Sequence, residues 1–93
     1  MIKSFKDRET GKVYSRKGSR KLPRDIQPVA LRKLVMVNNA RRINDLRVPP
    51  ANRLEKLSGN RAGQYSVRIN DKWRICFVWK DGDTHDVEIT DYH

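Results

Sequence analysis

Two arginines are the residues of this sequence whose type and spacing most clearly suggest a binding site. Arg68 and Arg74 flank a short turn sequence, and their parity places both on one side of a predicted hairpin. Two neighbouring guanidinium groups bind phosphate well, because the planar fork of arginine matches the phosphate oxygens. The same spacing also suits solvated arginines, or arginines paired with Asp86 or Glu88. The pattern predicts a phosphate site and leaves ordinary ion pairing open.

The chain ends in Asp91, Tyr92 and His93, directly after a predicted strand. Tyrosine and histidine side chains serve as general acids and bases, and an imidazole titrates near neutral pH. Because no linker separates His93 from the strand, we expect it at the sheet edge near Arg74. A histidine at a chain end is also often a solvated residue without a role, so spacing alone leaves both interpretations open.

The remaining residue types exclude several other chemistries. The single cysteine, Cys76, cannot form an internal disulfide, and one cysteine with two histidines in unrelated contexts does not make a zinc-ligand set. Strand parity turns Cys76 toward the polar side of the sheet, where we interpret it as a small packing residue. The sequence shows no glycine-rich phosphate loop and no serine nucleophile with a nearby base. We therefore predict no metal and no cofactor.

A helix is the first element that must support these residues. Apolar residues recur at three- and four-residue steps, which predicts an amphipathic helix over residues 25–38. The apolar stripe consists of Ile26, Val29, Ala30, Leu34 and Val37. Asp25 is the expected cap, because Pro28 is tolerated only in the first turn, whereas Arg32 and Lys33 fall off the stripe. Shorter helices are expected over residues 10–16 and 40–46.

Alternating apolar and polar residues between 65 and 90 predict three strands. The apolar positions are Tyr65, Val67, Ile69, Trp73, Ile75, Phe77, Trp79, Val87 and Ile89, and the turn sequences are 70–72 and 81–83. Residues 2–5 have the pattern of a further short strand. We expect an α+β fold in which the N-terminal helices pack on the apolar face of an antiparallel sheet. The polar face, with Arg68 and Arg74, is expected to be uncovered.

Length and charge limit the class of protein. Ninety-three residues make one small domain, residues 1–93, and exclude a multidomain enzyme. The net charge is +10, and residues 1–53 carry 15 Lys and Arg against 4 Asp and Glu, whereas residues 54–93 carry 6 and 7. This excess favours a polyanion partner, nucleic acid or the ribosome, over a membrane-surface helix or a merely solvated basic face.

The N-terminal segment provides information on how ordered the chain is and on where in the cell the protein is expected. Residues 6–24 are dense in lysine and arginine and are interrupted by Gly11, Gly18 and Pro23, so the sequence leaves open whether this segment is ordered. No apolar run approaches the roughly 18–20 residues that span a bilayer. The first six residues also lack the apolar region of a secretory signal. We expect a cytoplasmic protein.

Three stretches of the sequence resemble one known family. The longest runs from Arg53 to Phe77 and includes the turn Ile69-Asn70-Asp71-Lys72-Trp73-Arg74-Ile75. The others are the opening Met1-Ile2-Lys3-Ser4-Phe5 and the ending Asp86-Val87-Glu88-Ile89-Thr90-Asp91-Tyr92-His93. Together they resemble the toxins of the RelE/ParE superfamily, most closely the HigB branch, also called plasmid maintenance killer proteins. The resemblance covers nearly the whole chain and is looser across residues 6–24.

The resemblance implies a small α+β fold of the microbial ribonuclease type and the toxin of a type II toxin-antitoxin system. Such a toxin enters the A site of the 70S ribosome and cuts mRNA, which inhibits translation. The implied cut needs no metal: the RNA 2′-hydroxyl attacks the adjacent phosphate and leaves a 2′,3′-cyclic phosphate. The implied partner is a HigA-like antitoxin with a helix-turn-helix domain, through which alone the toxin would reach operator DNA. No membrane partner is implied.

The family's functional residues map onto particular positions of this chain. The resemblance assigns Arg74 to stabilising the charge of the transition state. It assigns Tyr92 and His93 to acid-base work or to stacking on the mRNA base, and Asp91 to orienting His93. The implied contacts with the RNA backbone are Arg53, Lys56, Arg61, Arg68 and Lys72.

Glu55 and Ser58 depart from the family pattern, because many relatives carry a histidine near the first position and a lysine at the second. The carboxylate of Glu55 can serve as a base in place of that histidine. Ser58 brings no charge, and we expect Lys56 to share its facing by strand alternation and to compensate in part. The identity of the general base is left open.

Two other functions remain open from the sequence. One is a ParE-like inhibitor of DNA gyrase, against which the terminal Tyr92 and His93 argue, because an inhibitor needs no acid-base pair. The other is a non-catalytic module that binds RNA or the ribosome, which Ser58 keeps open. The charge distribution also predicts that an acidic segment of the antitoxin contacts the basic N-terminal region, including residues 12–24. The resemblance implies that a HigA-type antitoxin need not cover the face that carries Arg74.

Overall fold

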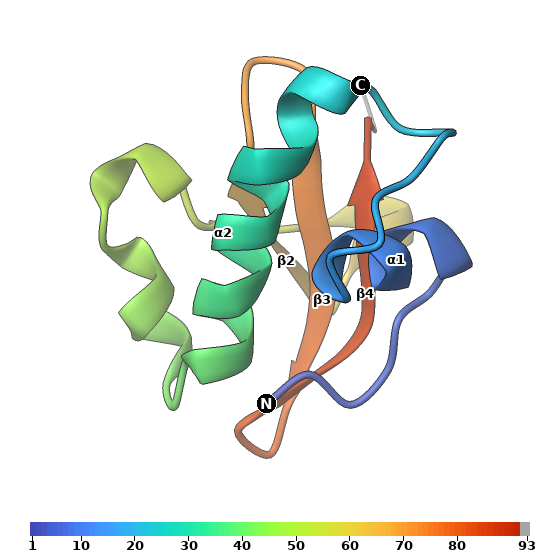
Figure 1. Ribbon diagram of the computed structural model, residues 1–93. Coiled ribbons are helices and arrows are strands. Elements are labelled where there is room, and N and C mark those ends of the chain that lie inside the picture. Colours follow the sequence, from blue (N-terminus) through green and yellow to red (C-terminus); the bar gives the residue numbers. More distant parts are fainter. Residues whose placement is uncertain (92–93) are drawn as a thin grey trace.

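The computed structural model describes residues 1–91, which form a sheet with the α-helices on one of its faces (Figure 1). The regular elements are α1 (Arg8–Tyr14), α2 (Gln27–Asn39), β1 (Glu55–Lys56), β2 (Gln64–Arg68), β3 (Arg74–Lys80) and β4 (Asp83–Thr90). The strands pair antiparallel in the order β1-β2-β3-β4, so each strand lies beside its neighbour in sequence. This arrangement confirms the predicted α+β fold.

The long helix begins later than the sequence pattern predicts. A 3₁₀ turn, η1 (Arg24–Ile26), precedes α2, and the expected cap at Asp25 is wrong, because Asp25 lies inside that turn. Pro28 occupies the first turn of α2, where its missing N–H costs nothing. Four of the five residues of the apolar stripe are buried as expected. Lys33 is also buried, at 5% exposure, so its placement off the stripe is wrong.

The N-terminal helix begins two residues before the expected position, because Asp7 caps it. The carboxylate of Asp7 accepts hydrogen bonds from the backbone N–H of Thr10 at 3.2 Å and from its hydroxyl at 2.6 Å. The Thr10 hydroxyl in turn accepts from the backbone N–H of Ile89 at 2.9 Å. This capping group therefore also ties α1 to β4.

Several short segments have a different secondary structure from the one that the sequence pattern predicts, because contacts with residues distant in sequence determine their conformation. The expected strand over residues 2–5 reduces to two isolated parallel bridges, Ile2 to Thr84 and Phe5 to Val87. The expected helix over residues 40–46 is a 3₁₀ helix, η2 (Ile43–Arg47), followed by a second one, η3 (Pro50–Asn52). The basic segment after α1 is a loop whose centre is anchored, since the buried Ser19 donates its hydroxyl to Glu9 at 2.6 Å.

The β3–β4 hairpin closes through Asp81 and Gly82, which both have positive φ, at 53° and 79°. This is the geometry of a two-residue type I′ turn, whose twist suits antiparallel strands. A bulge then shifts the register between Cys76 and Val78. Beyond the bulge, Cys76 pairs with Glu88 and Arg74 pairs with Thr90, so the end of β4 lies beside the start of β3.

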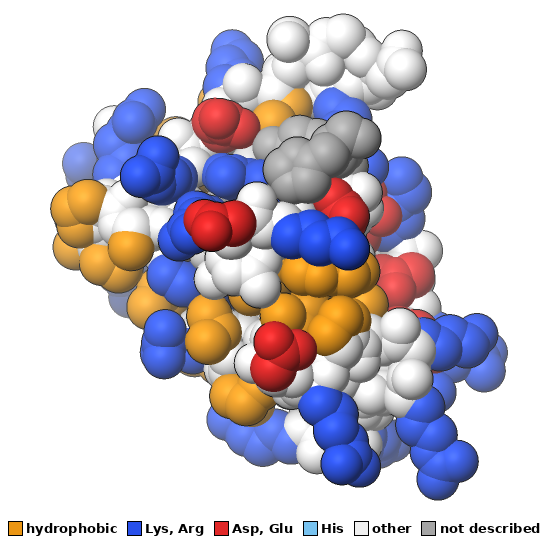
Figure 2. Space-filling model, turned by 90° about the horizontal axis from the view of Figure 1, so that it is seen from above, with side chains coloured by type: hydrophobic (Ala, Val, Ile, Leu, Met, Phe, Trp, Pro, Cys, Tyr) orange, Lys and Arg blue, Asp and Glu red, His pale blue; other side chains and the backbone are white. Residues whose placement is uncertain are grey.

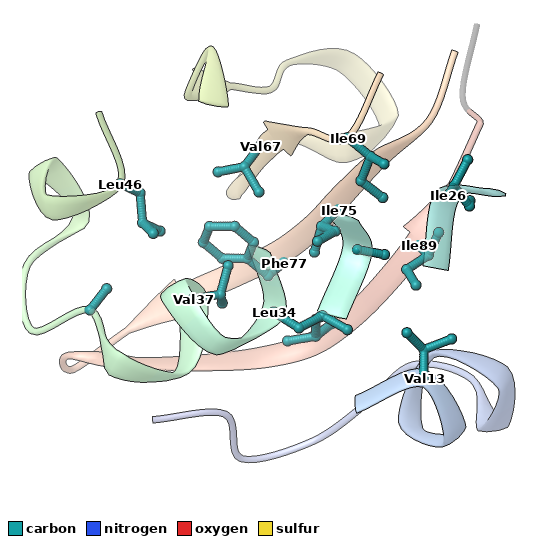
Figure 3. Close-up of a cluster of buried hydrophobic side chains, with 13 residues drawn as sticks. Val13, Ile26, Leu34, Val37, Leu46, Val67, Ile69, Ile75, Phe77 and Ile89 are labelled. Carbon is teal, nitrogen blue, oxygen red and sulfur yellow. The ribbon is translucent and has the colours of Figure 1, made fainter. Parts of the chain in front are cut away.

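One apolar cluster joins the helices to the sheet (Figure 3). Leu34 and Val37 of α2 face Ile75, Phe77 and Val67 of the sheet in this view, and all five are at most 1% exposed. The ring of Tyr65 stacks on Phe77 with the centroids 6.4 Å apart. Within residues 1–91, no helix combines the length and apolarity needed to cross a membrane.

Replacement of Leu34 by alanine tests whether α2 contributes the main share of this core. Leu34 is completely buried, so Leu34→Ala should lower the free energy of unfolding by about 3 kcal/mol, as expected for a large-to-small change in a core. Urea titration followed by circular dichroism measures this loss. Arg32→Ala is the matched control on the same helix, and its exposed side chain should change stability by less than about 0.5 kcal/mol. Equal losses in the two variants would contradict the packing described here.

Candidate functional site

Arg74 lies at the start of β3 and is held by two acceptors. Its Nε donates to the Ser66 hydroxyl at 2.8 Å, and its Nη2 donates to the backbone carbonyl of Arg53 at 2.6 Å. Both acceptors are uncharged, and within residues 1–91 Arg74 forms no ion pair with a carboxylate. The two acceptors therefore orient the guanidinium, and no carboxylate among residues 1–91 neutralises its positive charge.

A polar row crosses the sheet beside Arg74. Glu55, Ser66, Cys76 and Glu88 are register partners across the four strands, so they share the face that points away from α2. Ser66 and Cys76 are completely buried on this face. The expectation of an uncovered polar face is therefore wrong.

Arg61 supplies part of this cover. It lies in a fourth 3₁₀ helix, η4 (Gly59–Arg61), and the segment between β1 and β2 lies behind the sheet, on the side away from α2 (Figure 1). Its Nη1 donates to Glu88 at 2.8 Å and to the Gln64 amide oxygen at 3.1 Å. Lys6 reaches the same Glu88 carboxylate from the N-terminus at 3.5 Å. Strand alternation gives no signal for a loop that folds back over a sheet, which is why the sequence pattern missed this cover.

A hollow of about 390 Å³ opens next to Glu55, at the edge of the sheet. It is lined by Glu55, Lys56, Leu57, Ser58 and Arg61. Glu55 and Lys56 are both exposed. The structure thus brings a carboxylate and two of the predicted RNA-binding cations together around one concavity.

The predicted compensation for Ser58 does not follow from strand alternation. Strand β1 contains only residues 55 and 56, so no alternation extends to Ser58. Lys56 pairs with Tyr65, which places it on the opposite side of β1 from Glu55. Lys56 and Ser58 nevertheless line the same hollow, since the chain turns after β1.

Arg68 is the register partner of Arg74, but the two side chains have different partners. Arg68 forms an ion pair with Asp71, three residues later in the turn. Lys72 lies 3.7 Å from the Asp91 carboxylate, and its ammonium also lies 5.9 Å from the centre of the Trp73 ring. The turn between β2 and β3 therefore supplies the carboxylate that Arg68 binds, rather than the expected Asp86 or Glu88.

The remaining predicted site residues follow β4 in the sequence. Thr90 pairs with Arg74, so β4 ends beside the backbone of Arg74 at the start of β3. Asp91 is the last residue that the structure describes. Tyr92 and His93, the predicted acid-base pair, lie outside the described residues, so their proximity to Arg74 stays a prediction. Among residues 1–91, no three His, Cys, Asp or Glu side chains are grouped as metal ligands.

Two groups at Arg74 were not predicted from the sequence. Ser66 has the strand parity of Arg68 and so could have been placed on the same face as Arg74. The carbonyl of Arg53 has no such signal, because every residue carries one. Sequence reasoning selected Arg53 for its side chain, whereas the structure uses its backbone.

Known proteins with similar folds and sequences define the class of this molecule. The YoeB-YefM complex from Staphylococcus aureus contains a chain that superposes over 100% of this chain and 95% of its own length, with a TM-score of 0.61 at 19% identity. Toxin HigB-1 of Vibrio cholerae is 40% identical over 83 residues, which is 88% of this chain and 87% of the relative. Endoribonuclease HigB of Proteus vulgaris is 30% identical over 94 residues and covers both chains completely.

Residues 3–93 match the family described as RelE-like toxin of type II toxin-antitoxin system HigB. The fold and the match together define a RelE-like toxin. Within that superfamily, the chain belongs to the HigB-like toxins. This confirms the resemblance drawn from the sequence.

The burial of Cys76 predicts that its thiol reacts slowly in the folded protein. Withdrawal from water raises the pKa of Cys76 from 9.0 to about 11. At pH 8 the thiolate fraction should therefore be about 100-fold lower than in the unfolded chain, since only the thiolate reacts. We expect native protein to react with a disulfide reagent far more slowly than urea-unfolded protein.

The same pKa shift makes the free energy of unfolding depend on pH in the alkaline range. Between the two pKa values, the folded thiol keeps a proton that the unfolded thiol loses. The contribution of Cys76 to the free energy of unfolding is therefore fully present below pH 9 and is lost as pH rises toward about 11. Cys76→Ala should flatten this alkaline decline in chemical denaturation experiments. An equally steep decline in the variant would show that another group causes it.

Proposed function

We propose that this protein is a ribosome-dependent endoribonuclease that cuts mRNA in the A site and thereby inhibits translation. The observation that carries the proposal is the environment of Arg74: two neutral acceptors orient its guanidinium, and among residues 1–91 it forms no ion pair with a carboxylate. One of these acceptors, Ser66, is the register partner of Glu55, which lines the hollow. A guanidinium in this state is suited to the phosphate of an RNA backbone. Family membership and the name of the Proteus vulgaris relative, Endoribonuclease HigB, support the endoribonuclease part of this proposal.

The proposed reaction requires one base, one acid and one charge stabiliser. The base removes the proton of the RNA 2′-hydroxyl, whose oxygen bonds to the adjacent phosphorus while the bond to the 5′-oxygen breaks. The acid protonates that leaving oxygen, and the products are a 2′,3′-cyclic phosphate and a 5′-hydroxyl. Arg74 stabilises the charge on the phosphate oxygens. Side chains supply each of these groups, so the proposed step is written without a metal.

The proton transfers fall to the residues around Arg74. Glu55 lines the hollow and shares the face of Ser66, so we assign it as one candidate base. Tyr92 and His93 are the other candidates, with Asp91 orienting His93. If the ribosome orients the mRNA, positioning contributes much of the rate and the enzyme needs few groups of its own.

The distribution of basic residues supports a polyanionic partner. Figure 2, which views the molecule of Figure 1 from above, shows lysine and arginine side chains at many points of the outline. A second hollow, of about 1080 Å³, lies between α1 and the start of α2. Its cations are Lys12, Lys17, Arg20, Lys21 and Arg24. We propose that this basic hollow contacts ribosomal RNA in the toxic state and an acidic segment of a HigA-like antitoxin in the neutralised state.

Cleavage mapping on mRNA-programmed 70S ribosomes tests the proposed activity. Wild type should cut within the A-site codon, and Arg74→Ala should lower the cleavage rate by about 100- to 1,000-fold, as expected when a charge stabiliser is removed. A truncation lacking His93 should also lose cleavage. Arg47→Ala is the matched control, because Arg47 is exposed and bonds only Asn44 among the described residues.

The other outcomes separate the alternative functions. Ribosome binding without cleavage by wild type would replace the proposal with a non-catalytic module. Absence of ribosome binding, together with inhibition of gyrase, would support the ParE-like alternative.

Salt dependence of ribosome binding tests the basic hollow. The triple variant K17Q/R20Q/K21Q should reduce the slope of log affinity against log salt by about two, because each lost phosphate contact removes roughly 0.7–0.9. The control R41Q/R42Q/R47Q removes the same charge from the exposed η2 region and should change the slope less. Equal slopes for both variants would assign the effect to net charge alone. Antitoxin that covers Arg74 rather than residues 12–24 in a complex would contradict the second half of the proposal.

A further inference from the structure

The orientation of Arg74 depends on one rigid acceptor and one acceptor in a loop. Ser66 lies on the neighbouring strand β2, so the sheet fixes its position. The carbonyl of Arg53 lies in the segment that connects η3 to β1. Because a carbonyl points wherever its backbone dihedral angles direct it, the conformation of residue 53 determines whether this second bond forms.

Arg53 has an unusual backbone conformation for a residue with a side chain. Its φ of 44° and ψ of 55° lie in the left-handed region, which non-glycine residues seldom adopt. Its N–H donates to the Pro50 carbonyl at 3.0 Å, which closes the short η3 turn. A side-chain-bearing residue stays in this region only where neighbouring contacts hold it.

Asn52 supplies such contacts from the position directly before Arg53. It is completely buried, and its amide nitrogen donates to the carbonyls of Leu46 at 3.1 Å and Val48 at 3.3 Å. Its side-chain oxygen accepts a hydrogen bond from the ammonium of Lys33 on α2. A buried amide is costly without partners, and all of these partners come from elements that surround the η3 turn.

Lys33 connects this amide to the helix layer. It is 5% exposed, and burial lowers its pKa. The chain of contacts therefore runs from α2 through Lys33 and Asn52 to the turn at Arg53, and from the Arg53 carbonyl to Arg74. Each of these links is a direct contact or a covalent neighbour.

We propose that Asn52, held by Lys33, is a positioning residue for Arg74. It fixes the left-handed turn so that the Arg53 carbonyl holds the guanidinium in place, while Asn52 itself touches no RNA. Among residues 1–91, these contacts leave Nη1 of Arg74 without a hydrogen bond, which is the group then presented to a phosphate. The role of Arg74 in cleavage rests on the proposed function, whereas its positioning by Asn52 does not.

The positioning is tested by nuclear magnetic resonance of the arginine Nε–H group. The Arg74 signal is assigned with Arg74→Lys, and its hydrogen bond to Ser66 should distinguish it from the signals of solvated arginines. Asn52→Leu, which removes the side-chain hydrogen bonds of Asn52 at similar size, should shift that signal toward the solvated position or broaden it. Val13→Ala, a core change in α1, should leave the signal unchanged even though it lowers stability.

Cleavage kinetics on the ribosome are measured for the same variants. Asn52→Leu should lower kcat by about 10- to 100-fold with little change in KM, because a misplaced guanidinium loses transition-state contacts while RNA binding elsewhere is intact. Val13→Ala should keep kcat at a temperature where both variants are folded. If Asn52→Leu does not fold, Lys33→Met replaces it, with the same direction expected at smaller size.

The two measurements separate the positioning from the function. An unshifted Arg74 signal in the folded Asn52 variant overturns the positioning role, whatever the cleavage rate. A shifted signal with unchanged kcat supports positioning and contradicts the role of Arg74 in cleavage, which belongs to the proposed function. A shifted signal with reduced kcat supports both.

Discussion

Strand β3 is covered on both of its faces, and the geometry around Arg74 depends on this cover. Ile75 and Phe77 are buried under α2, whereas Cys76, between them, is buried on the opposite face. A strand that is fixed on both sides has no freedom to slide, because a shift of one residue would exchange its two faces. Arg74 is the first residue of this strand and only half-buried. The site therefore lies where the most constrained element of the fold reaches the surface.

The cations of the sheet differ in how much of their charge is available. Arg61, Arg68 and Lys72 each lie within 4.0 Å of a carboxylate, so an incoming phosphate has to replace a partner that is already present. Arg74 is held by a hydroxyl and a carbonyl, which orient it without opposing its charge. In the proposed function, the basic residues in the first half of the chain attract the polyanion from a distance. The proposal thus assigns long-range attraction and local phosphate binding to different parts of the molecule.

Sequence reasoning predicted those features that a local pattern determines. The periodicities of the apolar residues located α2 and the strands β2, β3 and β4, but not the two-residue strand β1. Strand parity placed Arg74 away from the core. The missed features depend on distant contacts: the cover of the polar face by Arg61, the capture of Arg68 by Asp71, and the burial of Lys33. A charged residue one position beside an apolar stripe looks solvated until a buried partner is known. The role of the Arg53 backbone carbonyl could not be predicted from a sequence pattern, because every residue has a carbonyl.

The buried Lys33 shows how the core and the site are connected. Burial of an ammonium group is unfavourable, as its lowered pKa indicates, and an apolar residue at this position would often be equally or more stable. Its contribution is instead directional, because its hydrogen bond holds the side-chain oxygen of Asn52, and an apolar residue would not donate to that oxygen. The amide in turn holds the carbonyls of Leu46 and Val48, which belong to the loop that brings Arg53 to the sheet. The contacts of Lys33 and Asn52 beneath α2 thus stabilise the fold less than an apolar pair would, but they fix the direction of the Arg53 carbonyl. The orientation of the Arg74 guanidinium follows from that direction.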